Sequence, residues 1–361
     1  AIAERWGIPH MVLVNVYPET YVFENEDYPI EEKRRQQFPD VWSGWWKLQV
    51  ETTMRQAAMA LRYHQFLVGV LLGNEPPFVI EGGGPRSTNP GAWHTQNWAL
   101  ALWQVGPNTP CRTALVKALS GAVPLDALNV FLVAHGTPAI PSYDWLLTND
   151  VEIPSGIDEL PAQIVRPMMA ATSLRYHQVA ATAFREAELS VDSTHPTHLV
   201  GSADFAGVTL EPALLEGIEK YVDFWQSHEY VPYPGTAEER LEGYRSACGD
   251  LPYFVTEFCH VDDSQDRYGP KGYIHVPDAA TKVDGYRRTV LAMSGKEAPG
   301  CMGISVHAEL DHVWNDGPEG PKTDQWGYVT RVTGKLGETA YSQYAEYAAG
   351  LRAANEEARR G

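Results

Sequence analysis

The stretch Leu67-Val-Gly-Val-Leu-Leu-Gly-Asn-Glu-Pro-Pro77 decides the fold that this chain is expected to adopt. Apart from Gly69, its first six residues are all apolar, and two prolines close the run. A short apolar run bounded by glycine and proline is typical of a buried strand in a parallel sheet. Asn74 and Glu75 follow the carboxyl end of that strand, which is where parallel α/β barrels carry out chemistry. The stretch therefore predicts a barrel strand with a candidate catalytic carboxyl group at its end.

A second glutamate follows another β-prone run, Leu251-Pro-Tyr-Phe-Val-Thr-Glu-Phe258. Two carboxyl groups at the ends of barrel strands are the minimum for cleaving a glycosidic bond. One protonates the leaving oxygen, and the other attacks the anomeric carbon or activates water. A carboxylic acid at the rim of a largely apolar barrel can have its pKa raised, so that it donates a proton near neutral pH. Taken alone, Glu75 also fits a solvated strand end and Glu257 a surface ion pair, but together they favour a glycosidase.

Composition places the chain among large globular proteins. Its 361 residues are 44% hydrophobic and 20% charged, enough for the core of a single catalytic (β/α) barrel domain over 1–361. The formal net charge of −18, without a basic patch, disfavours nucleic acid and polyanionic substrates and suits a neutral carbohydrate. No apolar run reaches the roughly 18 residues of a membrane span, and the first residues do not resemble a signal peptide. The compartment stays undetermined.

No cofactor and no metal are expected. The chain has four cysteines, Cys111, Cys248, Cys259 and Cys301. They form no CxxC pair and fit no zinc spacing, so buried free thiols are expected, with one or two disulfides left open. Metal-dependent barrels usually carry a His-x-His pair, which this chain lacks. His260 and two aspartates do cluster just after Glu257, so a metal-dependent barrel hydrolase stays an alternative.

Apolar runs alternate with helical periodicity along the chain, which is the pattern of a parallel α/β fold. Six strands are expected, near 11–16, 67–73, 198–204, 221–227, 252–257 and 301–306. The helices expected between and after them include 46–63, 162–189, 279–294 and 337–358. Residues 121–160 contain several prolines and read as a loop insertion that shapes the substrate site. Six strands are two fewer than a (β/α)8 barrel has.

The two glutamate motifs resemble those of the clan A glycoside hydrolases, which are retaining β-glycosidases built on TIM barrels. There, an Asn-Glu pair after strand four carries the acid/base, and a glutamate ending strand seven is the nucleophile. Gly73-Asn-Glu-Pro76 and Val255-Thr-Glu-Phe258 match these motifs. Ser227-His-Glu-Tyr230 resembles the His-x-Tyr pattern after strand six, and Trp314 resembles the sugar-platform tryptophan after strand eight. The layout is nearest to the family 42 β-galactosidase branch, and the resemblance covers roughly 1–345.

The resemblance implies a role for each matching residue. Glu75 would be the general acid/base and Glu257 the nucleophile of a double displacement that cleaves β-glycosidic bonds of neutral oligo- or polysaccharides with retention. Four further residues would complete the site: Asn74 on the sugar 2-hydroxyl, His228 as a substrate ligand, Tyr230 hydrogen-bonded to Glu257, and Trp314 beneath a sugar ring. For His228, a bond to a neighbouring loop is an equally good interpretation.

One departure from the clan concerns the start of the barrel. If Glu75 ends strand four, the strand near 11–16 is strand three, so this chain holds strands 3–8 and strands 1–2 are missing or supplied elsewhere. A missing N-terminal part is the favoured explanation, because an open barrel would expose strand edges. A homo-oligomer or a partner segment that completes the barrel is the other explanation. A non-catalytic sugar-binding barrel, or an inactive hydrolase fragment, remains the alternative function, and ligand binding without turnover would favour it.

Overall fold

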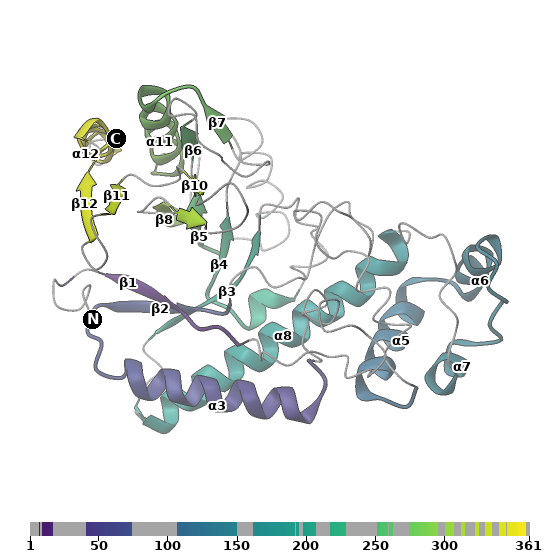
Figure 1. Cartoon of the computed structure of the whole chain (residues 1–361). Coiled ribbons are helices and arrows are strands. Elements are labelled where there is room, and N and C mark those ends of the chain that lie inside the picture. Colours follow the sequence, from purple (N-terminus) through teal and green to yellow (C-terminus); the bar gives the residue numbers. More distant parts are fainter. Residues whose placement is uncertain are drawn as a thin grey trace. The chain divides into compact units, whose positions relative to one another are not determined.

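A computed structural model describes the chain over residues 7, 9–16, 41–73, 107–149, 162–191, 193–194, 198–206, 217–228, 251–258, 260–262, 274–294, 300–306, 312–314, 322–324, 329–333, 339–343 and 345–358. The chain divides into two compact units, Ala1–Phe224 and Trp225–Gly361 (Figure 1).

Three parallel strands form the sheet of the first unit: β1 (His10–Leu13), β2 (Leu67–Leu71) and β3 (Leu199–Ala206). All three lie where the sequence predicts strands. β2 pairs with both neighbours and is buried along nearly its whole length, which explains its almost continuous apolar sequence. Gly69 is needed in this ladder, because a Cβ there would lie 2.5 Å from the carbonyl oxygen of Leu199 on β3. The two strands approach too closely at this point for any larger residue.

Two long helices of the first unit, α3 (Gly44–Leu61) and α8 (Ala162–Val191), pack against each other (Figure 1). Both confirm helices predicted from the sequence. Ser43 caps α3 by accepting a hydrogen bond from the amide of Trp46 at 3.0 Å. The buried side chains of α3 recur every three or four residues, as an amphipathic helix requires: Trp46, Val50, Met54, Ala58 and Leu61. Trp46 also contacts the ring of Tyr176 on α8, with ring centroids 5.7 Å apart.

A cluster of three helices overlaps the insertion expected at 121–160: α5 (Pro110–Ala122), α6 (Leu125–Ala134) and α7 (Tyr143–Thr148). The cluster has an apolar core of its own. The fully buried Arg112 donates to the carbonyl oxygens of Leu146 and Asn149, both at 2.8 Å, and so satisfies the carboxyl end of α7. Residues 150–161 lie outside the described part, and a substrate-shaping role for the segment stays a prediction.

No single helix within the described ranges has both the length and the apolar composition to cross a membrane. The helices α5 and α6 meet that test only when taken as a pair, and the pair is bent by 106°.

The second unit contains the parallel ladder of β4 (Phe224–His228), β5 (Tyr253–Phe258) and β8 (Cys301–Val306), again where strands are predicted. α11 (Ala279–Ser294) confirms another predicted helix and packs against α12 (Ala345–Ala358) (Figure 1). Arg287 on α11 binds both carboxylate oxygens of Glu357 on α12, at 2.6 and 2.8 Å. The hydroxyl of Tyr286 donates to Asn355 beside this pair.

Three short ladders complete the described part of the second unit. β6 (His260–Asp262) pairs with β7 (Ile274–Val276), β9 (His312–Trp314) with β10 (Lys322–Asp324), and β11 (Val329–Thr333) with β12 (Thr339–Gln343). β12 corrects the expected helix at 337–358, which begins only at Ala345. The threonine- and tyrosine-containing segment before it has a β-prone composition and finds a partner strand in β11.

Two of the four cysteines are described, and both are free thiols as expected. Cys111 is buried in α5, and Cys301 is half-buried at the start of β8. Cys248 and Cys259 lie outside the described residues.

The strand order in the sheet is β1-β2-β3-β4-β5-β8. Parallel strands that follow the order of the sequence, with helices between them, define the α/β class that the sequence predicts. The six strands correspond to part of a TIM barrel, while a closed barrel of eight strands is not shown over the described ranges.

Candidate active site

The structure describes the side chains of two of the predicted site residues, Glu257 and His228. Trp314 is described only as part of the backbone of β9. Asn74, Glu75 and Tyr230 lie outside the described residues. The separation of the two glutamates therefore stays a prediction, and the site is built from the Glu257 side.

Glu257 lies near the carboxyl end of β5, and 20% of its side chain is exposed. The next residue, Phe258, is buried and stacks on Tyr286 of α11, with ring centroids 5.7 Å apart. Because neighbouring side chains of a strand point to opposite faces of a sheet, Glu257 points away from α11. The carboxylate is thus partly accessible on the face of the sheet opposite the helix that covers it.

His228 ends β4 and lies beside Glu257 on the neighbouring strand. The ladder pairs the two residues, and Nδ1 of His228 lies 3.4 Å from Oε2 of Glu257. The imidazole side chain is fully buried. A proton on Nδ1 at this distance favours the ionised form of the carboxylate and restrains its orientation. The geometry therefore places His228 to orient Glu257, and its expected contact with substrate stays a prediction.

A bulge in the β4–β5 ladder brings these two side chains together. The strands pair in step as far as Ser227, but His228 then pairs with Glu257, so Thr256 is the extra residue of β5. The hydroxyl of Thr256 donates to the carbonyl oxygen of Ser227 at 3.1 Å. The ladder between β5 and β8 shifts register over the same segment. Glu257 thus lies at an irregularity shared by both ladders, where a bulge redirects a side chain.

Stacked aromatic rings support the other end of these strands. Trp225 on β4 stacks on Tyr253 on β5, with ring centroids 4.7 Å apart and planes 18° apart. The hydroxyl of Tyr253 reaches Sδ of Met293 on α11 at 3.8 Å. Sequence reasoning missed these supporting residues and the bulge at Thr256. The signal that could have indicated them is the polar Gln226-Ser-His run that ends a fully buried strand.

The sequence matches no protein-family model and no curated protein. Solved structures share its fold. A structure described as an exo-β-agarase gives a TM-score of 0.71 at 17% identity, covering 99% of this chain and 43% of that one. An agarase gives 0.71 at 15% identity, covering 99% and 46%. The β-galactosidase of the Antarctic haloarchaeon Halorubrum lacusprofundi gives 0.50 at 15% identity, covering 88% and 42%.

These similarities show that the chain has a fold found in glycoside hydrolases, as the sequence predicts. They do not single out clan A or family 42. The chain spans less than half the length of each of these three proteins.

Proposed function

We propose that this chain carries the catalytic site of a retaining β-glycosidase of the clan A type. The observation that carries the proposal is the contact between Glu257 and His228 at the carboxyl ends of two parallel strands. In α/β barrels this end holds the catalytic groups. The fold shared with agarases and a β-galactosidase supports the same reaction class. In this proposal the catalytic domain is a single barrel over 1–361.

The reaction uses Glu257 as nucleophile and Glu75 as acid and then base. A carboxylate oxygen of Glu257 attacks the anomeric carbon while the glycosidic C–O bond breaks, and the proton of Glu75 passes to the leaving oxygen. This step leaves the sugar esterified to Glu257. Water then attacks the anomeric carbon, gives a proton to the Glu75 carboxylate and releases Glu257. Two inversions at the same carbon give net retention of configuration.

The proposed substrate is a neutral β-galactoside, either an oligosaccharide or a galactose-based polysaccharide such as agarose. The names of the structural neighbours point to this sugar. The net charge of −18 disfavours a sulfated or otherwise anionic polymer. Asn74 would bind the sugar 2-hydroxyl, Tyr230 would hold Glu257, and Trp314 would lie under a sugar ring.

A screen of nitrophenyl β-glycosides tests the reaction class. The chain is expected to release nitrophenol fastest from the β-galactoside, and the first sugar formed is expected to be the β-anomer, because two displacements preserve configuration. Proton NMR of the anomeric signal during the first minutes distinguishes the two anomers. An α-anomer as first product would contradict the double displacement. Galactoside or agaro-oligosaccharide binding without any turnover would instead support the non-catalytic alternative.

His228→Gln tests whether the buried imidazole acts on Glu257. Glutamine retains a hydrogen-bond donor but cannot carry the proton that favours the ionised carboxylate. We expect kcat on an aryl β-galactoside to fall by about tenfold to a hundredfold, the scale at which a misplaced catalytic group is felt, with KM changing little. Steady-state kinetics at neutral pH measure both constants. The matched control is His135→Gln at the end of α6, which is expected to retain activity. A rise in KM with kcat unchanged would indicate a substrate ligand instead.

A further inference from the structure

The carboxyl end of β2 is held by a side chain from α8. The hydroxyl of Tyr176 donates to the carbonyl oxygen of Leu72 at 2.8 Å, and both residues are fully buried. Gly73 follows with a φ of 98°, a left-handed conformation that favours glycine. The direction in which the chain leaves the strand is therefore determined here. Glu75 comes three residues after Leu72 in the sequence.

The next residue of α8 holds the neighbouring strand. Nε2 of His177 accepts a hydrogen bond from the amide of Ala203 on β3 at 3.0 Å, and Nδ1 donates to the carbonyl oxygen of Ser173 at 2.7 Å. This arrangement needs a neutral imidazole with the proton on Nδ1. Leu72 itself donates to Ser202, the neighbour of Ala203, at 3.4 Å. Consecutive residues of one helix thus bind the backbones of two adjacent strands at the same level.

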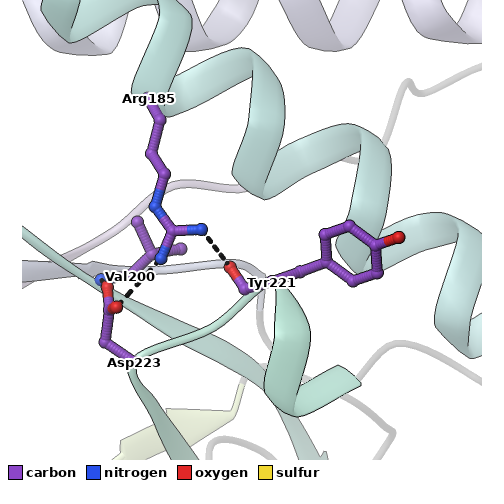
Figure 2. Close-up of polar contacts among 4 residues, drawn as sticks. All are labelled: Arg185, Val200, Tyr221 and Asp223. Atoms are coloured by element: carbon purple, nitrogen blue, oxygen red, sulfur yellow. Dashed lines mark hydrogen bonds and ion pairs between the residues drawn. The ribbon is translucent and has the colours of Figure 1, made fainter. Parts of the chain in front are cut away.

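The same helix also binds the opposite end of the strands. Figure 2 shows Arg185 donating to the carbonyl oxygen of Tyr221 at 2.7 Å and to Oδ1 of Asp223 at 2.9 Å. The other oxygen of Asp223 accepts from the amide of Val200 at 2.8 Å. These residues lie near the start of β3 and just before β4. In barrel enzymes, bonds at this end serve stability, whereas bonds at the carboxyl end serve the site.

We propose that Tyr176 is a positioning residue for the general acid. It acts through the Leu72 carbonyl oxygen, which it fixes three residues before Glu75. This inference rests on the proposed function, because it assigns Glu75 as the proton donor. A hydrogen bond from a rigid, buried helix restrains the strand end more tightly than packing alone, because any shift would leave the carbonyl oxygen unpaired. No sequence motif marks this residue.

Tyr176→Phe and the leaving-group dependence of kcat/KM test the proposal. Phenylalanine retains the ring that packs on Trp46 and removes only the hydroxyl. Dinitrophenolate leaves without a proton, whereas phenolate needs one from the acid. We therefore expect kcat/KM to fall about tenfold or more for phenyl β-galactoside and to stay within about twofold for dinitrophenyl β-galactoside. A merely structural role would lower both rates by the same factor and leave their ratio unchanged.

Two further variants separate the possible outcomes. Arg185→Gln, at the opposite end of α8, is the stability control and is expected to lower the unfolding midpoint without changing the ratio of the two rates. Glu75→Gln should depress phenyl galactoside turnover far more than dinitrophenyl galactoside turnover. If Glu75→Gln affects neither, the acid assignment in the proposed function fails, and the inference falls with it. If Glu75→Gln behaves as expected but Tyr176→Phe leaves the ratio unchanged, only the positioning role is overturned.

Discussion

Glu257→Ala is expected to lower kcat on an aryl β-galactoside by on the order of 10⁴-fold, the scale seen when a catalytic nucleophile is removed. Without the carboxylate, no covalent sugar ester forms, and water has no activated route to the anomeric carbon. Folding should survive, because Glu257 is partly exposed and Phe258 still packs on α11. Stopped assays on concentrated protein measure the residual rate, and circular dichroism checks the fold.

Azide separates the roles of the two glutamates. In Glu257→Ala, azide can occupy the space of the missing carboxylate and attack the anomeric carbon directly, so the expected product is the α-glycosyl azide. In Glu75→Ala, azide attacks the ester on Glu257, and the expected product is the β-glycosyl azide. Glu357→Ala on α12 removes an exposed carboxylate of the second unit and is expected to retain full activity. Unchanged turnover in Glu257→Ala, or azide products of the opposite configuration, would refute the assignment.

Acidification from pH 7 to pH 4 is expected to destabilise each unit through one buried histidine. Burial lowers the pKa of His177 in the first unit to about 4, and the Ser173 carbonyl opposes this only in part. Burial also lowers the pKa of His260 in the second unit to about 4, and the positive charges of Lys282 and Arg288 add to the effect. His260 lies directly against α11, since a Cβ on Gly285 would be 2.5 Å from its Nε2.

The direction of the effect follows from which state binds the proton. Above pH 6.5, the ordinary histidine pKa, both side chains are neutral whether the chain is folded or unfolded, and stability is at its full value. As the pH falls towards 4, the unfolded chain binds protons that the folded chain does not, so stability declines. Below about 4 both states are protonated and this loss stops. The shift corresponds to about 3 kcal/mol for each histidine.

Variants that cannot titrate reveal these contributions. We expect His177→Gln to flatten the pH dependence of hydrogen exchange at amides of α8, and His260→Gln to do so at amides of α11. Urea unfolding between pH 4 and pH 7 gives the corresponding free energies. His135→Gln, which leaves both buried histidines in place, should retain the acid limb of the unaltered chain. Curves for all variants that run parallel from pH 7 to pH 4 would show that other groups cause the acid loss.

Much of the scaffold can be predicted from local sequence. Strands buried on both faces need apolar side chains throughout, so β2, β3 and β8 appear as short apolar runs bounded by polar or glycine residues. Long amphipathic helices repeat their buried residues every three or four positions, so α3 and α8 are recognisable in the same way. The start of α12 was wrong, because β12 depends on pairing with β11, and a pairing partner is not a local property.

The carboxylate at the end of β5 was likewise predictable, because a glutamate closing a β-prone run is visible in the sequence. Its surroundings were not. The insertion of Thr256 in the ladder decides that His228 faces Glu257, and a change of one residue in register would separate them. Tyr176 and His177 show no motif at all, since their function depends on which strand ends α8 passes.

The sequence by itself thus determined the α/β class, the order of its strands and helices, and the two glutamates on which the proposed chemistry depends. These features follow from local patterns of apolar and polar residues, which each short segment carries within itself. Only the tertiary structure decided that His228 contacts Glu257 and that Tyr176 holds the strand leading to Glu75. Such contacts join residues distant along the chain, and they depend on strand register and helix docking, which arise only when the whole sheet and its helices pack together.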